Sequence, residues 1–307
     1  MDPVKILWVK ANKLLPVYSG GDIRSYNILR QLARRHQVTL LSYYDGTPDS
    51  AYESELQQRF AGAVCVCTRR SANTTLKRGL DYLLRLANPM PYAVSRFASS
   101  EVREELNSRY SSVVFEVVVC DFLDAAVNFP ETLSIPSVLF QHNVESEIWR
   151  RQAETESNVL LKSLYSKELR KMRRYERAMV QKLHQVIAVS EHDRELMGRW
   201  RNPLQISVVP TGVDVAQFSS VAPRSAPQPL VVFVGAMDWE LNIDAAEFFC
   251  GEVLPKIQSK IPEDVSWGAI PAKEFKSSKG PWWKSLEVCL VLWSTYRRQR
   301  LWSFRCA

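Results

Sequence analysis

Polar and glycine residues follow several apolar stretches of the sequence, at the positions where predicted strands end. Ligands of open α/β sheets bind at the carboxyl ends of the strands, so these positions are the first candidates for a site. The candidates are residues 19–22, Asp121, His142, Asn143, Ser190, Glu191, residues 211–214, and Gly235 with the loop after it.

Gly20 and Gly21 stand directly before a predicted helix. Free backbone N–H groups and the helix dipole favour an anion such as phosphate at a helix start of this kind. A tight strand-to-helix turn without a ligand also explains the pair, and on the pair alone it is the favoured interpretation. The fingerprints GxGxxG and GxxxxGK[ST] are absent from the sequence, which argues against an NAD dehydrogenase and a P-loop NTPase.

His142 ends the apolar stretch at residues 137–143. A histidine at a strand end can offer one ring nitrogen to a ligand while its other nitrogen is held, or it can simply cap its own loop. Glu145 and Glu147 follow, and their charges also suit the first turn of a helix. These side chains lack the HExxH spacing and a further ligand, so no metal site is predicted.

The elements that must position these residues alternate along the chain. Strands are expected at residues 4–11, 37–44, 63–67, 113–121, 137–143, 185–190 and 205–214. Helices are expected at residues 22–36, with Asp22 as N-cap, and at 50–60, 101–110, 145–184 and 191–200. The alternation predicts an α/β protein with a doubly wound parallel sheet.

A second domain is expected after a linker. Residues 219–229 contain three prolines and no apolar period, and a new strand, loop and helix begin at Leu230. After Pro262 acidic residues become rare and five of the nine tryptophans follow. The predicted organisation is a first domain at residues 1–218, a linker at 219–229, the start of a second domain at 230–264, and an irregular, basic, Trp-rich tail at 265–307.

The net charge of +7 is unevenly distributed, because residues 265–307 hold 8 of the 40 Lys+Arg but 2 of the 33 Asp+Glu. The rest of the chain is near neutral, so no nucleic acid partner is predicted. The helical region at 145–184 is rich in Lys and Arg and could lie against anionic lipid. The interpretation favoured at this point is a solvated face on which Glu168 and Glu176 pair with the basic side chains.

The N-terminus lacks a secretory signal, and no apolar run reaches about 18 residues, which predicts a cytoplasmic location. Six irregularly spaced cysteines agree with a reducing compartment.

Five segments in order resemble the GT4 group of retaining glycosyltransferases, which have the GT-B architecture of two Rossmann-like domains. The segments are SGGDIRSYNILRQLARRHQVTLL, VLFQHNVESEIWRR, HQVIAVSEHDRELM, VVPTGVDVAQF and VVFVGAMDWELNIDAAEFF. The resemblance implies transfer of a sugar from a nucleotide diphosphate donor to a glycan or lipid-linked acceptor hydroxyl, without a cofactor or metal. It also allows peripheral membrane contact.

The resemblance also assigns roles to residues. It implies a catalytic role for His142 beside the transferred sugar. It implies that substrate is bound by Gly20, Gly21, Asp22, Asp121, Asn143 and Glu145, and that donor is bound by Gly235, Asp238 and Asn242.

The sequence departs from the family pattern in its second half. The family carries two donor-binding glutamates eight positions apart in its second domain, and the only such pair here is Glu168 and Glu176, in the first domain. The expectation is therefore an incomplete second Rossmann-like domain, truncated or frame-shifted, and a chain with little or no activity of its own. The alternatives are a non-catalytic binding module and a subunit completed by another chain.

Overall fold

The computed structural model describes residues 2–17, 19–68, 81–82, 84–112, 115–213, 215, 230–235, 240–260 and 266–271. The chain forms two compact units, Met1–Gly212 and Val213–Ala307, and each contains its own parallel sheet.

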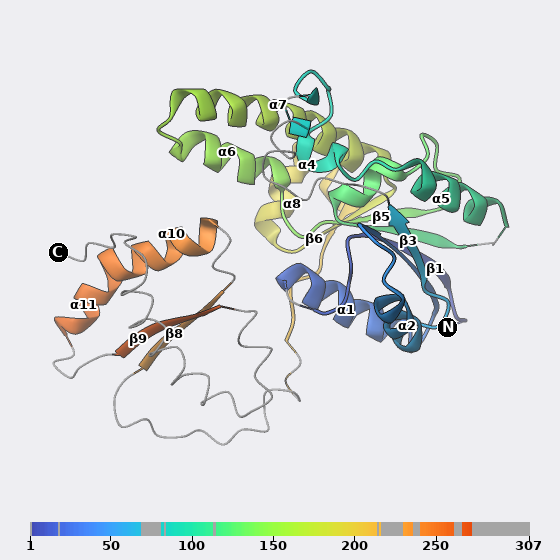
Figure 1. Ribbon diagram of the computed structural model, residues 1–307, viewed down its shortest axis with the longest axis horizontal. Helices are drawn as coiled ribbons and strands as arrows, with labels where there is room; N and C mark the ends of the chain where they lie inside the picture. The colour runs from blue at the N-terminus through green and yellow to red at the C-terminus, as the bar shows by residue number, and fades with distance from the viewer. Residues whose placement is uncertain are drawn as a thin grey trace. The chain divides into compact units, whose positions relative to one another are not determined.

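The first unit is built on a seven-stranded sheet with the order β3-β2-β1-β4-β5-β6-β7 (Figure 1). Its strands are β1 (Lys5–Ala11), β2 (Gln37–Asp45), β3 (Val64–Thr68), β4 (Val117–Asp121), β5 (Ser137–Phe140), β6 (Gln185–Ala188) and β7 (Ile206–Val208). All neighbouring strands are parallel, which confirms the predicted doubly wound sheet. The strand order reverses between β1 and β4, and this is where such sheets bind ligands.

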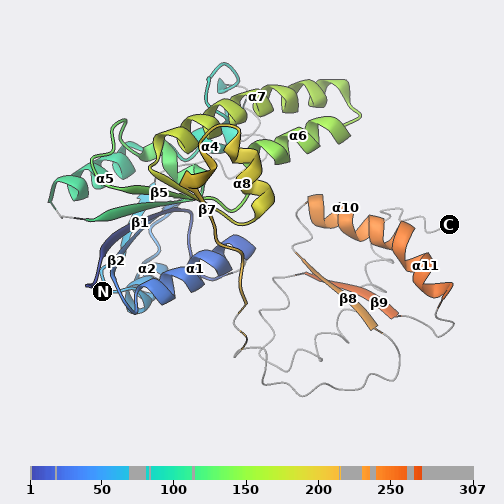
Figure 2. The same ribbon diagram turned by 180° about the vertical axis from the view of Figure 1, so that it is seen from behind.

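Helices cover both faces of this sheet, α1 and α2 on one and α5, α7 and α8 on the other (Figures 1 and 2). The helices are α1 (Gly20–Leu32), α2 (Ser50–Arg59), α4 (Tyr92–Ser95), α5 (Ser100–Ser112), η1 (Leu123–Asn128), α6 (Glu145–Thr155), α7 (Val159–Lys182), α8 (Glu191–Gly198) and η2 (Pro203–Gln205).

The two faces of β1 supply two separate hydrophobic cores, because successive side chains of a strand point to opposite sides. Ile6 and Trp8 pack with residues of α1 and α2, whereas Leu7 and Val9 pack with residues of α5 and α7. A strand buried on both faces is apolar at almost every position, and a charged residue within it requires a specific partner.

Two helix predictions are wrong in detail. The helical region expected at 145–184 is two helices, because Glu156 and Asn158 have extended backbone and Asn158 caps a new helix with its side chain. Asp22 is not the N-cap of α1. Ser19 has that position, and its hydroxyl accepts the N–H of Asp22. The strand expected at 113–121 begins at Val117, and residues 113–114 lie outside the described part.

The second unit contains β8 (Leu230–Gly235) and β9 (Ser266–Pro271), which pair in parallel. Between them run α10 (Glu240–Phe248), the π-helical turn η3 (Phe249–Val253) and α11 (Leu254–Gln258). This is one βαβ unit, and its second strand uses residues that the sequence assigned to the tail. The predicted linker at 219–229 and the tail beyond Pro271 lie outside the described residues.

Within the ranges that the structure covers, no helix has both the length and the apolar composition needed to cross a membrane.

Candidate functional site

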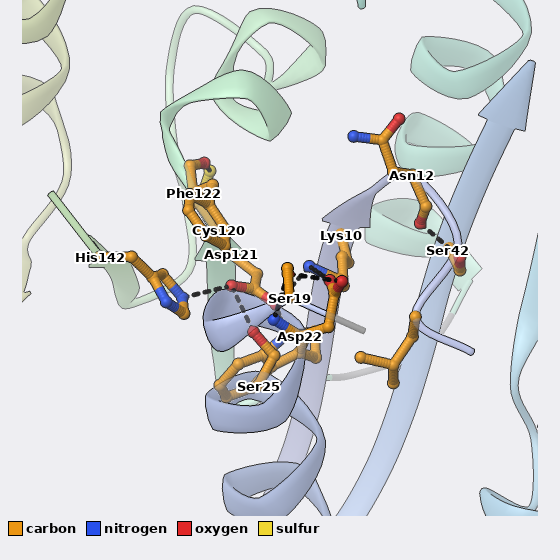
Figure 3. A network of polar contacts seen from close by, with 12 residues as sticks. Lys10, Asn12, Ser19, Asp22, Ser25, Ser42, Cys120, Asp121, Phe122 and His142 are labelled. Atoms are coloured by element: carbon orange, nitrogen blue, oxygen red, sulfur yellow. Dashed lines mark hydrogen bonds and ion pairs between the residues drawn. The ribbon is translucent and has the colours of Figure 1, made fainter. Parts of the chain in front are cut away.

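A buried polar network lies where the strand order reverses, at the carboxyl ends of β1 and β4 (Figure 3). Lys10 of β1 and Asp121 of β4 are register partners on these neighbouring strands. Both are almost fully buried, with exposed fractions of 2% and 0%. Buried charges of this kind require partners, and the partners come from α1, β1 and the loop after β5.

The Asp121 carboxylate is the centre of the network. Its Oδ1 accepts hydrogen bonds from Ser25 Oγ and His142 Nε2, both at 3.0 Å. Its Oδ2 accepts from Trp8 Nε1 at 2.9 Å and lies 3.7 Å from Lys10 Nζ. Burial alone raises the pKa of Asp121, but Lys10 and the donors from His142 and Trp8 outweigh it and hold this pKa below its usual value. Asp121 is therefore ionised at neutral pH.

Lys10 connects this carboxylate to the start of α1. Its Nζ lies 3.2 Å from Asp22 Oδ1, and the ammonium also lies 5.1 Å from the centre of the Phe122 ring. Asp22 in turn accepts a hydrogen bond from Ser19 Oγ at 2.6 Å. The positive charge of Lys10 thus balances the negative charge of Asp22 in the first turn of α1. Without Lys10, Asp22 would repel an anionic ligand at this helix start.

His142 is held in one orientation. Its ring stacks on Phe122 with centroids 3.7 Å apart and an interplanar angle of 3°. Burial lowers the pKa of His142 more than Asp121 raises it, so the ring is neutral at pH 7. Because the Asp121 carboxylate can only accept, Nε2 carries the proton and Nδ1 is left as an acceptor. Among the described residues, nothing donates a hydrogen bond to Nδ1.

The two glycines at the start of α1 differ in their surroundings. A Cβ on Gly21 would lie 2.5 Å from Phe122 Cζ and 3.7 Å from His142 Nδ1, whereas a Cβ on Gly20 would meet nothing within 4 Å. Gly21 therefore allows the helix to approach the stacked rings. The N–H groups of both glycines belong to the first turn, where the helix itself supplies no acceptor.

The loop that carries His142 is fixed by residues distant in sequence. Arg24 Nη1 donates to the carbonyl of Gln141 at 3.1 Å. The Glu176 carboxylate of α7 accepts from Gln141 Nε2 at 3.0 Å, from Glu145 N at 2.8 Å and from Ser146 N at 3.0 Å. A carboxylate on free N–H groups at a helix start is favourable, so Glu176 acts as a cap for α6.

A group of carboxyls lies beside this loop. Burial, the charge of Asp124 and the charge of Glu176 raise the pKa of Glu145 to about 8. Burial also raises the pKa of Asp124 to about 6. Glu145 is half-buried and largely protonated at neutral pH, so its carboxyl can donate a hydrogen bond. In the part of the chain that the structure covers, no group of three His, Cys, Asp or Glu residues could hold a metal ion.

The structure brings several predicted site residues together. Asp121 and His142 are hydrogen-bonded, Gly21 packs against His142, and Asp22 is linked to Asp121 through Lys10. Gly20 lies beside Gly21 at the open start of α1.

The other predicted residues lie further from this centre or apart from it. Asn143 is exposed, and its side chain forms a hydrogen bond with the side chain of Glu145. Gly235 ends β8 and Asn242 lies half-buried in α10, both in the second unit. Asp238 lies outside the described residues.

Four residues of this network were not predicted from the sequence as members of the site: Lys10, Phe122, Arg24 and Glu176. Lys10 had a detectable signal, because it is a charge near the end of an apolar strand next to the candidate glycines. Phe122 follows Asp121 directly and adopts a left-handed backbone with φ of 68°, which sequence does not reveal in a non-glycine residue. Arg24 and Glu176 act on residues that are distant in sequence. Arg24 is separated from its partner Gln141 by 117 positions, and Glu176 from its partners by 30 or more.

Comparisons with known proteins give one family and several distant structures. A family model described as Glycosyltransferase Family 4 matches residues 18–217. A search of curated proteins finds no match.

Solved structures that resemble the chain include HepE of Anabaena in complex with UDP and glucose, with 13% identity and a TM-score of 0.46 over 96% of this chain and 68% of that one. Phytolacca americana UGT2 complexed with UDP-2-fluoro-glucose and pterostilbene has 13% identity and a TM-score of 0.44, over 90% and 73%. A trehalose 6-phosphate synthase from Burkholderia multivorans has 12% identity and a TM-score of 0.46, over 88% and 65%. These likenesses are too distant to carry a functional argument.

Proposed function

Because the chain belongs to Glycosyltransferase Family 4, we propose that its first unit is the acceptor-side half of a retaining transferase that uses a nucleotide-sugar donor. The proposed reaction moves a sugar from a nucleoside diphosphate to an acceptor hydroxyl and keeps the anomeric configuration. The network at the carboxyl ends of β1 and β4 supports this proposal, because it lies at the ligand-binding position of a doubly wound sheet.

One observation carries the assignment of His142: Asp121 holds its Nε2–H, and its Nδ1 has no donor among the described residues. We assign Nδ1 as the acceptor for a hydroxyl of the transferred sugar. Asp121 is a positioning residue, since it fixes the tautomer and the ring plane rather than meeting substrate. The Phe122 ring restrains the same imidazole from its flat side.

The start of α1 is the proposed anion-binding end of the site. The N–H groups of Gly20 and Gly21 and the positive end of the helix dipole can stabilise phosphate charge without a metal. Lys10 neutralises Asp22 in this turn. Asn143 and Glu145, on the loop beyond His142, are assigned to substrate hydroxyls, and the protonated carboxyl of Glu145 supplies a donor.

The donor side is proposed to be Gly235, Asp238 and Asn242 in the second unit. The glutamate pair expected on that side has no counterpart in the chain, because the one pair with the required spacing is used elsewhere. Glu168 binds the N–H of Tyr92 at 2.8 Å and Glu176 caps α6, both inside the first unit. We therefore propose that this chain binds nucleotide-sugar weakly.

Sugar transfer is tested with the full chain at millimolar donor, because weak binding raises KM without preventing turnover. Nucleoside diphosphate release from UDP- and GDP-sugars is measured with and without a mixture of glycan and lipid-linked acceptors. Little release is expected from this chain, because its donor side lacks the glutamate pair. Any acceptor-dependent release should be removed by His142→Ala, and NMR of the product should show the donor's anomeric configuration. Release that His142→Ala leaves unchanged contradicts the assignment of this site.

The alternative is a non-catalytic binding module or a subunit completed by another chain, and the engaged Glu168 and Glu176 favour it. Isothermal titration with UDP and GDP distinguishes the transferase hypothesis from this alternative. Micromolar binding would show that the chain holds a working donor site. Binding of acceptor glycans without nucleoside diphosphate binding or transfer would support the alternative.

A further inference from the structure

Arg24 lies on the face of α1 that meets the polar network. Gly21, Arg24 and Ser25 have the spacing i, i+3, i+4, which places them on one side of a helix. Gly21 packs against His142, and Ser25 donates a hydrogen bond to Asp121. The side chain of Arg24 therefore reaches the same strand ends, where it is 5% exposed.

The guanidinium of Arg24 joins two strands that are not neighbours in the sheet. Nη1 donates to the carbonyl of Gln141, directly after β5, and Nη2 donates to the carbonyl of Val209, directly after β7. β6 lies between these strands, and its last two carbonyls accept the N–H groups of Gln141 and Val209. The planar fork of one arginine thus spans the end of β6. The two carbonyls cannot shift relative to one another without loss of a hydrogen bond.

The charge of Arg24 has no carboxylate in contact with it. Among the residues that the structure describes, Arg24 forms no ion pair, and its Nε is buried without a hydrogen-bond partner. The guanidinium lies 4.2 Å from the centre of the Phe140 ring. A buried cation with an unsatisfied donor costs folding free energy, and an apolar side chain of similar length often fills such a position at less cost. Packing alone therefore does not explain an arginine here.

Arg24 holds both the loop that carries His142 and the end of the first unit. Gln141 directly precedes His142, and the first unit ends three residues after Val209. We propose that Arg24 is a positioning residue that couples the place of the His142 ring to residues 209–212, through which the chain continues into the second unit. Displacement of this segment then displaces the imidazole. The functional meaning of this coupling rests on the proposed role of His142 as the acceptor for a sugar hydroxyl.

The charge of Arg24 also acts on the His142 ring. The charged groups that face His142 are Asp121 of β4, Lys10 of β1 and Arg24 of α1. Burial lowers the pKa of His142 most, Arg24 and Lys10 lower it further, and Asp121 raises it. Arg24→Met should therefore raise the pKa of His142. Arg24→Lys keeps the charge but cannot hold two carbonyls in one planar fork, so the two variants separate the charge of Arg24 from its geometry.

The coupling is tested by a double-mutant cycle between Arg24 and the exposed Pro210. A proline restricts its own backbone and that of the residue before it, so Pro210→Gly loosens Val209 without removing a hydrogen-bond donor. Hydrogen exchange of residues 141–146, measured by mass spectrometry on the full chain, reports the mobility of the His142 loop.

The expected result is a non-additive cycle. Arg24→Met should raise the exchange rate of the loop about tenfold, the usual effect of losing a hydrogen bond from a charged donor. Pro210→Gly should raise this rate about threefold in the wild-type background and produce no further increase beside Arg24→Met. The pKa of His142 is followed by NMR, in which the four histidines of the chain are assigned by substitution.

Two control variants share the chemistry of these changes but lie elsewhere in the first unit. Arg201→Met removes another arginine that donates to three backbone carbonyls, at the end of α7 and just after it. Pro48→Gly loosens another exposed proline, in the loop before α2. Neither variant should change the exchange of residues 141–146 or the pKa of His142. Thermal melting establishes that every variant is folded, and Arg24→Lys replaces Arg24→Met in the cycle if the methionine variant does not fold.

Additive effects of the Arg24 and Pro210 changes would overturn the proposal, because the two carbonyls would then move independently. An equal gain in loop exchange from Arg201→Met would overturn it as well, since the effect would follow general destabilisation. None of these measurements requires sugar transfer. A non-additive cycle in a chain without transfer would therefore count against the proposed function alone, whereas an additive cycle beside transfer that depends on His142 would count against the coupling alone.

Discussion

The His142 imidazole donates from Nε2 to Asp121 Oδ1 over 3.0 Å, which joins the loop after β5 to the end of β4. This bond sets the protonation pattern of the site, since an ionised carboxylate accepts only from a protonated nitrogen. The free Nδ1 therefore follows from the position of Asp121, whose burial at the end of β4 is fixed by the sheet.

Asp121→Asn tests that relationship. The new amide places an NH2 group among the donors Trp8, Ser25 and His142, and it leaves Lys10 with Asp22 alone. We expect unfolding free energy to fall by about 3–5 kcal/mol, the usual effect of breaking a buried charge pair. Nitrogen-15 NMR of the histidine rings should show the Nε2–H tautomer of His142 at pH 7 in the wild type and its loss in the variant. An unchanged tautomer would mean that Asp121 does not set it.

Gly21→Ala and Gly20→Ala form a natural comparison at the start of α1. The Cβ on residue 21 would come within 2.5 Å of Phe122, so the ring must move and its stacking on His142 is lost. Overpacking of this kind costs about 1–3 kcal/mol. The same change at residue 20 meets no atom and should be neutral or stabilise by about 0.5 kcal/mol. Urea unfolding of both variants measures the difference, and equal effects would show that the contact is not tight.

Glu176→Ala tests the cap on α6. It leaves Gln141 Nε2 and the N–H groups of Glu145 and Ser146 without their acceptor. Buried donors left unsatisfied cost about 1–3 kcal/mol each, so a loss of about 2–5 kcal/mol is expected. Glu154→Ala is the matched control, since this exposed residue pairs with Arg150 and should contribute less than about 1 kcal/mol. Comparable losses in the two variants would rule out a special role for Glu176.

Glu145→Gln should change how stability depends on pH. The pKa of Glu145 is raised to about 8 in the folded chain, so the unfolded chain loses this proton first as pH rises. Stability is therefore unaffected below the ordinary glutamate pKa of about 4.5 and declines between there and about pH 8. The variant should melt higher than wild type at pH 8 and show no comparable gain at pH 5. A gain of the same size at both values would contradict a raised pKa.

Much of the first unit could be predicted from the sequence, because apolar strands and amphipathic helices have distinct periods. The strand at 37–44 and the helix at 50–60 were placed to within one residue of β2 and α2. The break between α6 and α7 was missed, since both helices are amphipathic and Asn158 is a weak signal alone.

The site was predicted in part. Strand ends identified Asp121 and His142, because topology brings carboxyl ends together. The partners that hold them were not found, since Lys10, Arg24 and Glu176 act through contacts that only the packed structure defines. Glu168 forms the expected i,i+3 ion pair with Lys171, at 2.9 Å, whereas Glu176 points inward and caps α6, which only the packed structure defines.

The hydrogen bond from Arg24 Nη2 to the carbonyl of Val209, at 2.6 Å, bears on the order in which the site is assembled. Arg24 also holds Gln141, so the loop bearing His142 is tied indirectly to the segment just after β7. During synthesis the residues of the network leave the ribosome long before residue 209 does. The last of these restraints therefore forms only after nearly the whole first unit has emerged. A nascent chain stopped before β7 would lack the anchor of Arg24 on Val209, although Asp121 and Glu176 could already hold the loop.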